Sequence, residues 1–445
     1  MTSWVKDLEF SFGDAMIPQQ RILETVKRLR PMIRNMANAL SGGCEGDMAS
    51  LCLPDDMLML GKIRQVIGEK LQLKPTYLIV NGIGGSNLGT IAVQEAVLGK
   101  LYNQLTTSTK VLYADTVDSD SINNIITLIK PVLEKGGNIL LNVISKTGTT
   151  TETIANAEVL IDTIRRHKKD YKKCITVTSD TDSELWNIAV KEGFKVLEIQ
   201  KKVGGRYSVF SPVGLFPLGL LGIDIKRLLD GAKCMNAVCI DTNIEKNPAA
   251  ISAAIQYLHY ESGKNISDLF LFANDLESLG KWCRQLMAES LGKKFNRKGE
   301  TVNTGITPVI SIGSTDLHSM AQLYLGGPYD KFTTFLSVEN SNSNINVPTL
   351  REYSKLVYGI QGKSLESVMN AIVEGTKAAF RKGNRPFVEI KLSCKSEYQI
   401  GQFLQFKMIE TIYLGYLLDV NPFDQPNVES YKEETRKILQ KNETN

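Results

Sequence analysis

The sequence predicts an α/β protein with two αβα sandwich domains, each built on a parallel sheet, plus an N-terminal helical arm and C-terminal helices. Short apolar runs alternate with helical stretches from about residue 75, and a second series of the same kind follows a helical connection. Because crossover helices join parallel strands, this alternation places helices on both faces of each sheet. A chain of 445 residues is also long enough to divide into two or three domains.

The first series contains apolar runs of the length expected for buried strands. These runs lie at residues 77–80, 111–114, 138–144, 174–178 and 196–199. Helices are expected between them at 119–133 and 152–167. The second series has expected strands at 269–273, 309–312, 333–338 and 387–392, and two further helices are expected at 402–418 and 429–440.

These elements divide the chain into five expected regions. They are a helical arm (1–50), a first sandwich domain (51–225), a helical connection (226–260), a second sandwich domain (261–418) and a helical tail (419–445) that carries Lys432.

The composition is that of an ordinary globular protein and does not indicate a nucleic-acid partner. Hydrophobic residues make up 42% of the chain and charged residues 22%, and the formal net charge is only +4. The basic run from Arg165 to Lys173 is expected to be a solvated helix face.

The seven cysteines are odd in number, scattered and free of any C-x-x-C pair, which favours reduced thiols in a cytoplasmic protein. The N-terminus lacks the apolar core of a signal peptide. The most hydrophobic segment, 207–225, is interrupted by Pro212, Pro217 and glycines, so no membrane span is expected. Three dispersed histidines without a Cys/His cluster predict no metal site.

A loop rich in hydroxyl groups follows the expected strand at 138–144. Residues 145–151 hold five Ser and Thr side chains and one lysine, at the point where a strand should turn into a helix. Hydroxyls, a lysine and the free amides of a helix N-terminus together suit a dianionic phosphate. The alternative is an ordinary Ser/Thr-rich loop with a helix cap.

A glycine turn, Gly82–Gly89, follows the expected strand at 77–80 and precedes a helical stretch. Glycines here allow the backbone to approach a ligand closely. The spacing does not fit a dinucleotide fingerprint, because Asn87 and Ser86 stand where glycine would be needed.

Three further residues are candidates for chemistry, and each also has a purely structural interpretation. His318 follows an expected strand end, where ligands of open α/β sheets gather, whereas His167 and His259 look like surface or packing residues. Glu289 is four residues after Gln285 on an expected helix and could act as a base or be a surface carboxylate. Arg206 follows two glycines and could stabilise an oxyanion or simply fasten a loop.

Taken in order, these segments resemble the glucose-6-phosphate isomerase (phosphoglucose isomerase) family, in its compact prokaryotic type with two domains of the sugar-isomerase (SIS) fold. The matching stretches are GIGGSNLG at 82–89, SKTGTTTET at 145–153, GGRYSVFSPVGL at 204–215, QLMAESLGK at 285–293, STDLHS at 314–319 and NPFDQPNVESYK at 421–432. They run in family order across most of the chain, from about residue 80 to 432.

The resemblance implies roles for the individual residues. The sugar phosphate would be held by Ser145, Lys146, Thr147 and Thr150, with Gly85 and Ser86 nearby. The catalytic group would consist of Glu289 as the base between C1 and C2, Arg206 at the enediolate, and His318 and Lys432 in ring opening. Further substrate contacts would come from Gln285 and Gln425, and Glu152 would orient the histidine.

The resemblance further implies reversible isomerisation of glucose 6-phosphate and fructose 6-phosphate in glycolysis and gluconeogenesis, without a cofactor. It also implies a homodimer in which His318 reaches the site of the neighbouring subunit. Two alternatives stay open at this point. One is a sugar-phosphate sensor without turnover, and the other is an isomerase that acts on mannose 6-phosphate.

Overall fold

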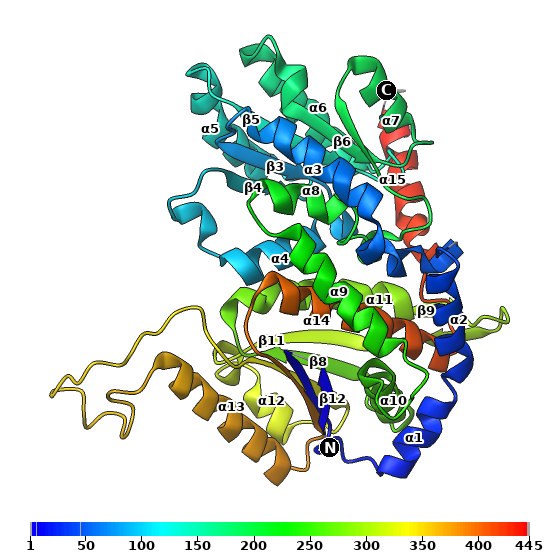
Figure 1. Ribbon diagram of the computed structural model, residues 1–445, viewed down its shortest axis with the longest axis vertical. Coiled ribbons are helices and arrows are strands. Elements are labelled where there is room, and N and C mark those ends of the chain that lie inside the picture. The colour runs from blue at the N-terminus through cyan, green and yellow to red at the C-terminus, as the bar shows by residue number, and fades with distance from the viewer. Residues whose placement is uncertain (1, 6, 45, 443–445) are drawn as a thin grey trace.

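The computed structural model describes residues 2–5, 7–44 and 46–442, and it contains two largely parallel sheets with helices packed on both faces of each (Figure 1). This arrangement confirms the predicted α/β class. The boundaries of the five expected regions stay predictions.

The first sheet has the strand order β4-β3-β5-β6-β7, and all its pairings are parallel. Its strands are β3 (Tyr77–Asn81), β4 (Lys110–Ala114), β5 (Ile139–Ile144), β6 (Ile175–Ser179) and β7 (Lys195–Glu198). Every residue of the central strand β5 is buried, as expected for a strand covered on both faces. One face is covered by α5 (Ser119–Glu134), α6 (Thr151–His167) and α7 (Glu184–Glu192), the other by α3 (Met57–Leu71), α4 (Leu88–Leu98) and α8 (Pro212–Leu220).

The second sheet has the order β1-β2-β13-β12-β8-β11. Its strands are β1 (Thr2–Val5), β2 (Leu8–Ser11), β8 (Ile266–Leu271), β11 (Thr307–Ile312), β12 (Lys331–Val338) and β13 (Phe387–Leu392). A cluster rich in phenylalanine packs α12 (Ala321–Gly326) and α13 (Leu365–Lys382) on one face. The opposite face carries α10 (Pro248–Glu261), α11 (Glu277–Leu291) and α14 (Glu397–Leu417).

The prediction of a purely helical N-terminal arm is wrong at its beginning. Strands β1 and β2 form a hairpin, and β2 pairs with β13 in antiparallel register before the chain enters α1 (Gln19–Lys27) and α2 (Arg30–Ser41). Leu8 and Phe10 are buried and alternate with Glu9 and Ser11, which are not. This period-two pattern is too short to stand out in the sequence, and it becomes a strand because β13 offers a free edge.

Two helices cross at close range in the centre of the molecule, where α9 (Ile225–Cys239) meets α14. A Cβ on Gly231 would lie 1.9 Å from the Tyr398 carbonyl oxygen, and one on Gly401 would lie 2.0 Å from the Leu228 carbonyl oxygen. Both glycines are therefore required by the contact, because any side chain would push the two backbones apart.

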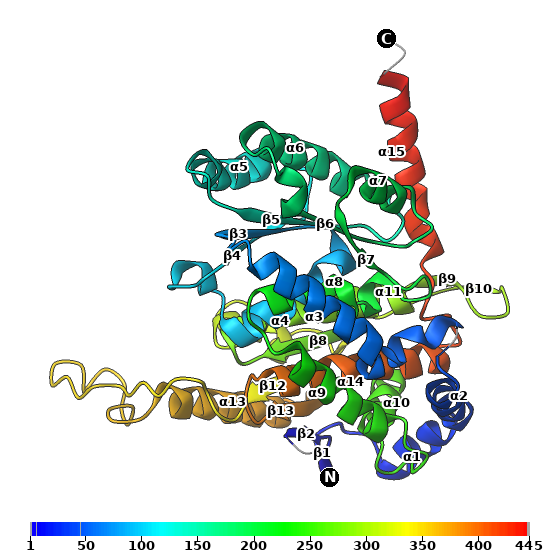
Figure 2. The ribbon, with the colours of Figure 1, turned by 45° about the horizontal axis from the view of Figure 1, so that its top comes forward.

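Two segments extend from the body of the protein (Figure 2). The connection between β12 and α13, residues 339–364, protrudes in both views and is closed at its base by a bridge between Asn346 and Ser364. The tail helix α15 (Glu429–Asn442) runs alongside α7 of the first sandwich. A small hairpin of β9 (Lys293–Phe295) and β10 (Thr301–Thr304) follows α11.

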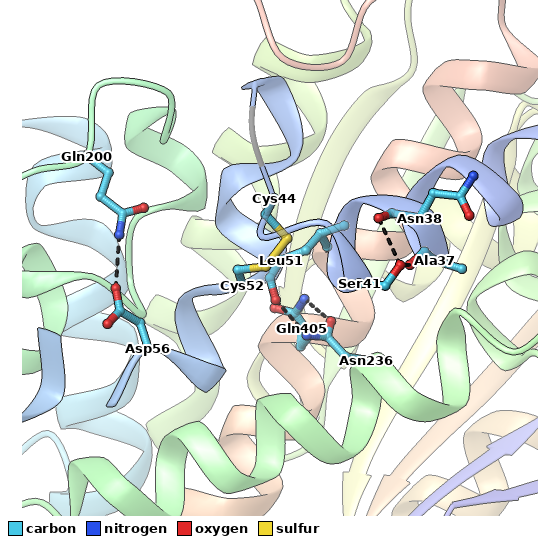
Figure 3. The surroundings of a disulfide bond; sticks show 10 residues. All are labelled: Ala37, Asn38, Ser41, Cys44, Leu51, Cys52, Asp56, Gln200, Asn236 and Gln405. Carbon is cyan, nitrogen blue, oxygen red and sulfur yellow. Dashed lines mark hydrogen bonds between the residues drawn. A yellow bond between two sulfur atoms is a disulfide. The ribbon is translucent and has the colours of Figure 1, made fainter. Parts of the chain in front are cut away.

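The expectation that all cysteines are reduced is wrong for one pair. Cys44 and Cys52 form a disulfide with their Cα atoms 5.8 Å apart, whereas the other five cysteines are free thiols (Figure 3). The disulfide lies just before α3, next to Leu51, whose carbonyl accepts a hydrogen bond of 2.7 Å from Asn236. The two cysteines are eight residues apart and no motif flanks them, so the sequence did not predict this pairing.

None of the helices in the described ranges is both long and apolar enough to span a lipid bilayer.

We expect Gly401→Ala to lower the melting temperature by several degrees, because the added methyl group must displace the Leu228 carbonyl at the α9–α14 crossing. The matched control is Gly375→Ala on α13, where a Cβ would meet no atom within 4 Å. That change should leave the melting temperature equal or slightly higher, since alanine favours the helix. Equal melting temperatures for the two variants, measured by calorimetry, would contradict the close crossing.

Candidate active site

Two loops that the sequence singled out lie together at the carboxyl edge of the first sheet. Strands β3 and β5 pair in parallel, with Asn81 opposite Val143, so the glycine turn and the hydroxyl-rich loop leave the sheet side by side. A Cβ on Gly82 would lie 2.8 Å from the Ser86 Cβ and 3.1 Å from the Ile144 carbonyl oxygen. The turn therefore folds tightly against the start of the loop at Ser145.

The same glycine turn touches the loop that carries Arg206. A Cβ on Gly85 would lie 2.2 Å from the carbonyl carbon of Gly205 and 2.7 Å from the Arg206 nitrogen. The two turns meet backbone to backbone, which only a residue without a side chain permits. Gly85 thus fixes where the backbone of Arg206 lies.

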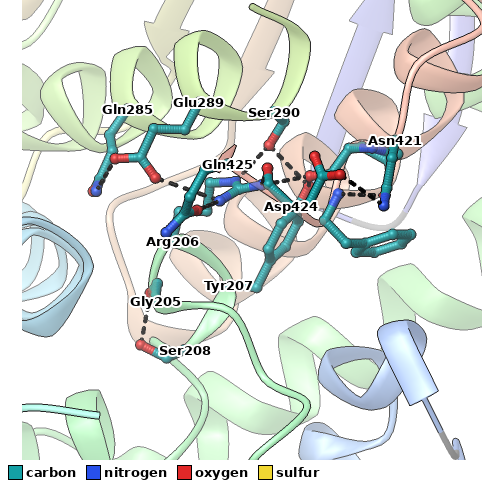
Figure 4. A network of polar contacts seen from close by, with 12 residues as sticks. Gly205, Arg206, Tyr207, Ser208, Gln285, Glu289, Ser290, Asn421, Asp424 and Gln425 are labelled. Carbon is teal, nitrogen blue, oxygen red and sulfur yellow. Dashed lines mark hydrogen bonds and ion pairs between the residues drawn. The ribbon is translucent and has the colours of Figure 1, made fainter. Parts of the chain in front are cut away.

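Arg206 is 1% exposed, and its guanidinium joins three separate segments (Figure 4). Nε donates to Ser290 Oγ at 2.7 Å, and Nη2 donates to the carbonyl oxygens of Pro422 and Asp424 at 2.6 and 3.1 Å. Nη1 donates to Gln425 Oε1 and contacts a carboxylate oxygen of Glu289 at 3.4 Å. A buried cation is tolerated here because each nitrogen has an acceptor.

Glu289 and Gln285 lie one turn apart on α11 and face Arg206 (Figure 4). Gln285 Nε2 donates to Glu289 Oε1 at 2.8 Å, while Arg206 contacts Oε2. The Glu289 side chain is still 29% exposed. The carboxylate is thus held on both oxygens and remains open to a ligand, which is the arrangement a general base needs.

The hydroxyl-rich loop is ordered by its own hydrogen bonds at the N-terminus of α6. The Ser145 and Thr150 hydroxyls lie 3.0 Å apart, and the Gly148 amide donates to Ser145 Oγ at 3.1 Å. Lys146 Nζ donates to the Val203 carbonyl at 2.9 Å, and burial lowers the pKa of this ammonium. Thr147 stays exposed, so the loop offers hydroxyls next to the positive end of a helix dipole.

Lys432 reaches this loop from the tail helix. Thr147, Thr150, Glu152 and Lys432 all line one cavity of about 290 Å³. Lys432 Nζ donates to Glu429 Oε1 at 2.7 Å, and this hydrogen bond lowers the pKa of the Glu429 carboxyl. Within the described residues, Lys432 has no hydrogen bond or ion pair with Glu289 or Arg206.

His318 belongs neither to the polar network of Arg206 nor to the residues that line the cavity with Lys432. It lies exposed in the turn that follows β11, where the Asp316 carboxylate accepts a 2.7 Å hydrogen bond from the Ile312 amide. Its ring has no hydrogen-bond partner among the described residues. His259 is buried against Phe332, and burial lowers its pKa to about 4, whereas His167 is exposed on α6.

The sequence did not single out Lys293 or Ser290 as contributors to this site. Lys293 is 6% exposed and donates to the carbonyl oxygens of Glu289 and Asp424 at 2.7 and 2.5 Å. It also pairs with the Asp424 carboxylate at 3.1 Å, and burial lowers the pKa of its ammonium. The only sequence signal was the position of both residues in the stretch that contains Glu289.

No group of three or more His, Cys, Asp or Glu side chains suited to a metal occurs in the part of the chain that the structure describes.

The fold and the site define a class of α/β protein in which a carboxylate and a buried arginine lie close to a loop suited to phosphate. Residues 70–445 match the sequence profile of the phosphoglucose isomerase family, and the chain belongs to that family. The resemblance predicted from the motifs is confirmed.

Relatives and solved structures agree with this assignment. The chain is 34% identical over 406 residues to glucose-6-phosphate isomerase of Carboxydothermus hydrogenoformans, covering 89% of this chain and 85% of the relative. It is 31% identical to the Thermus thermophilus enzyme of that name, over 96% and 97% of the two chains. The crystal structure of a glucose-6-phosphate isomerase from Chlamydia trachomatis superposes with a TM-score of 0.83 at 19% identity, over 99% of this chain and 89% of that one, which shows the shared fold.

We expect Arg206→Lys to loosen the segment 421–428, because a lysine cannot supply the guanidinium's separate bonds to Ser290, Pro422 and Asp424. Hydrogen–deuterium exchange of these amides should accelerate by about 10-fold or more, the effect of losing hydrogen bonds to a charged group. The matched control is Arg297→Lys, which removes a half-exposed contact with Asp419. Equal protection of 421–428 in both variants would show that Arg206 does not hold this segment.

Proposed function

We propose that this protein catalyses the reversible isomerisation of glucose 6-phosphate and fructose 6-phosphate through ring opening and a cis-enediolate, the interconversion that glycolysis and gluconeogenesis share. The observation that supports the reaction most directly is the contact of 3.4 Å between Arg206 and Glu289. A carboxylate and a fixed cation lie together here, which supports a proton transfer through an enediolate. Membership of the phosphoglucose isomerase family supports the choice of substrate.

In the proposed mechanism, Glu289 removes the proton from C2 of the open-chain aldose. The electron pair moves to the C1 carbonyl oxygen, and Arg206 offsets the negative charge on the enediolate. Glu289 then returns the proton to C1. The C2 hydroxyl passes its proton to the C1 oxygen, so that C1 carries a hydroxyl and C2 becomes the carbonyl of the ketose. Gln285 supports this step because its 2.8 Å hydrogen bond orients the carboxylate of Glu289.

Ring opening precedes this transfer and needs an acid at the ring oxygen and a base at the C1 hydroxyl. We assign these roles to His318 and Lys432, with Glu152 orienting the histidine and Gln425 contacting the sugar. The hydrogen moves as a proton within a single substrate, so the reaction balances without a redox cofactor.

The phosphate of the substrate is assigned to the loop at the N-terminus of α6, through Ser145, Lys146, Thr147 and Thr150. The backbone of Gly85 and the hydroxyl of Ser86 complete this side of the site. The tight fold of the turn supports this, because a Cβ on Gly82 would lie only 2.8 Å from the Ser86 Cβ. Binding the phosphate away from the reacting carbons fixes the orientation of C1 and C2.

The position of His318 favours a site that is completed by a second subunit. The ring is exposed on the turn after β11, and among the described residues it has no hydrogen bond with the polar network of Arg206. A homodimer in which His318 crosses to the neighbouring site would bring the catalytic groups together. The protruding segment 339–364 supports association, because Tyr353, Leu356 and Tyr358 are 61%, 73% and 99% exposed on it.

We also assign the protein to the cytoplasm, where its sugar-phosphate substrates are metabolised.

We expect Glu289→Gln to lower kcat by a factor of about 10²–10⁴, the usual effect of losing a general base. Competition by inorganic phosphate should persist, because the hydroxyl-rich loop is unchanged. The assay is formation of glucose 6-phosphate from fructose 6-phosphate. The matched control is Glu277→Gln, a change of the same kind in the first turn of the same helix. Near-normal turnover in Glu289→Gln would remove this residue from the mechanism.

The shared site is tested by mixing inactive His318→Ala and Glu289→Gln subunits. If His318 acts across a symmetric dimer, one site of every mixed dimer is intact, and an equal mixture should recover about a quarter of the wild-type activity. Mass spectrometry of the native dimers verifies subunit exchange. Mixed dimers without activity would indicate a site built within one chain.

A further inference from the structure

The cavity between the hydroxyl-rich loop and the tail helix contains a second cation besides Lys432. Six residues of α15 line the cavity, and four of them recur at helical spacing and share one face of the helix, namely Glu429, Lys432, Arg436 and Leu439. The opposite wall is formed by Thr147, Thr149, Thr150 and Thr151. Arg436 therefore shares a cavity with hydroxyls at the N-terminus of α6.

The two lysines of this region, Lys146 and Lys432, each already direct one N–H donor to a neighbouring residue. Lys146 Nζ donates to the Val203 carbonyl at 2.9 Å, and Lys432 Nζ is 2.7 Å from the carboxylate of Glu429. The charge of Lys432 is thus largely offset by its neighbour. Arg436 is exposed and forms no hydrogen bond or ion pair with any described residue, although its charge, after that of Lys432, also helps to lower the pKa of the Glu429 carboxyl.

A phosphate dianion in this cavity needs a cation with free donors. The planar guanidinium matches two phosphate oxygens with two parallel N–H groups, whereas an ammonium binds as a point charge. The threonine hydroxyls and the α6 amides can supply the remaining hydrogen bonds.

We propose that Arg436 binds the phosphate group of the sugar phosphate and makes the enzyme specific for phosphorylated substrates. This inference rests on the proposed function and adds a residue from the tail helix to the phosphate site. Because the phosphate lies away from C1 and C2, Arg436 contributes to substrate affinity and takes no part in the proton transfer.

The test compares Arg436→Gln with Lys437→Gln. Lys437 is the next residue on the same helix, pairs with Glu434 at 2.7 Å and does not line the cavity, so its variant removes the same charge elsewhere. Arg436→Gln should raise KM for fructose 6-phosphate and the inhibition constant of inorganic phosphate, each by about 10-fold or more, the effect of losing a charged hydrogen bond. The kcat should stay within about threefold of wild type, since the reacting carbons are not touched.

Arg436→Lys should restore part of the affinity, because it returns the charge without the fork of donors. An inhibition constant for phosphate equal to that of Lys437→Gln would overturn the proposal. So would a loss of kcat at unchanged phosphate affinity, which would assign Arg436 to the docking of α15. If the wild type shows no isomerase activity, the proposed function fails. Calorimetric titration of wild type and variant with inorganic phosphate then decides the role of Arg436 by itself.

Discussion

The arrangement of this site depends on the buried guanidinium of Arg206. A charged group taken out of water is stable only where each of its donors finds an acceptor. Here the acceptors come from Ser290 on α11 and from the segment after α14, while the arginine itself comes from the loop after β7. One side chain thereby connects the first sandwich, the second sandwich and the start of the tail.

Arg206 also contacts the carboxylate of Glu289. Its carboxylate lies against a cation that cannot lose its proton, so a negative charge on either Glu289 or a bound substrate is stabilised at this point. Because Arg206 is held by neutral carbonyls as well, the proposed mechanism would not require this side chain to reorient when charge passes from the carboxylate to an enediolate. Such a prearranged cation lowers the barrier without a cost of reorganisation during the reaction.

The parts of the site that follow strand ends were predictable, because the rule that ligands gather at the carboxyl edge of a parallel sheet needs only strand positions. This is why the sequence predicted that the loops at Gly85 and Ser145 follow strands, which β3 and β5 confirm, whereas their contact with a phosphate stays a prediction. The hairpin β1–β2 was missed because its pairing partner, β13, lies almost a whole chain length away. The disulfide of Cys44 and the contacts of Lys293 depend on tertiary packing that no local pattern encodes. The roles of His318 and Lys432 rest on family resemblance, and among the described residues neither side chain has a hydrogen bond or ion pair with Glu289.

The pairing of β2 with β13 has a consequence for the order of folding. The strands of the first sheet, from β3 to β7, form a continuous stretch that can close as soon as it leaves the ribosome. The second sheet closes later, because β2 is made near the start of synthesis and its partner β13 near the end. Strand β2 therefore lacks one of its two neighbours until β13 emerges, and the long loop that this closure spans makes it a slow, late step.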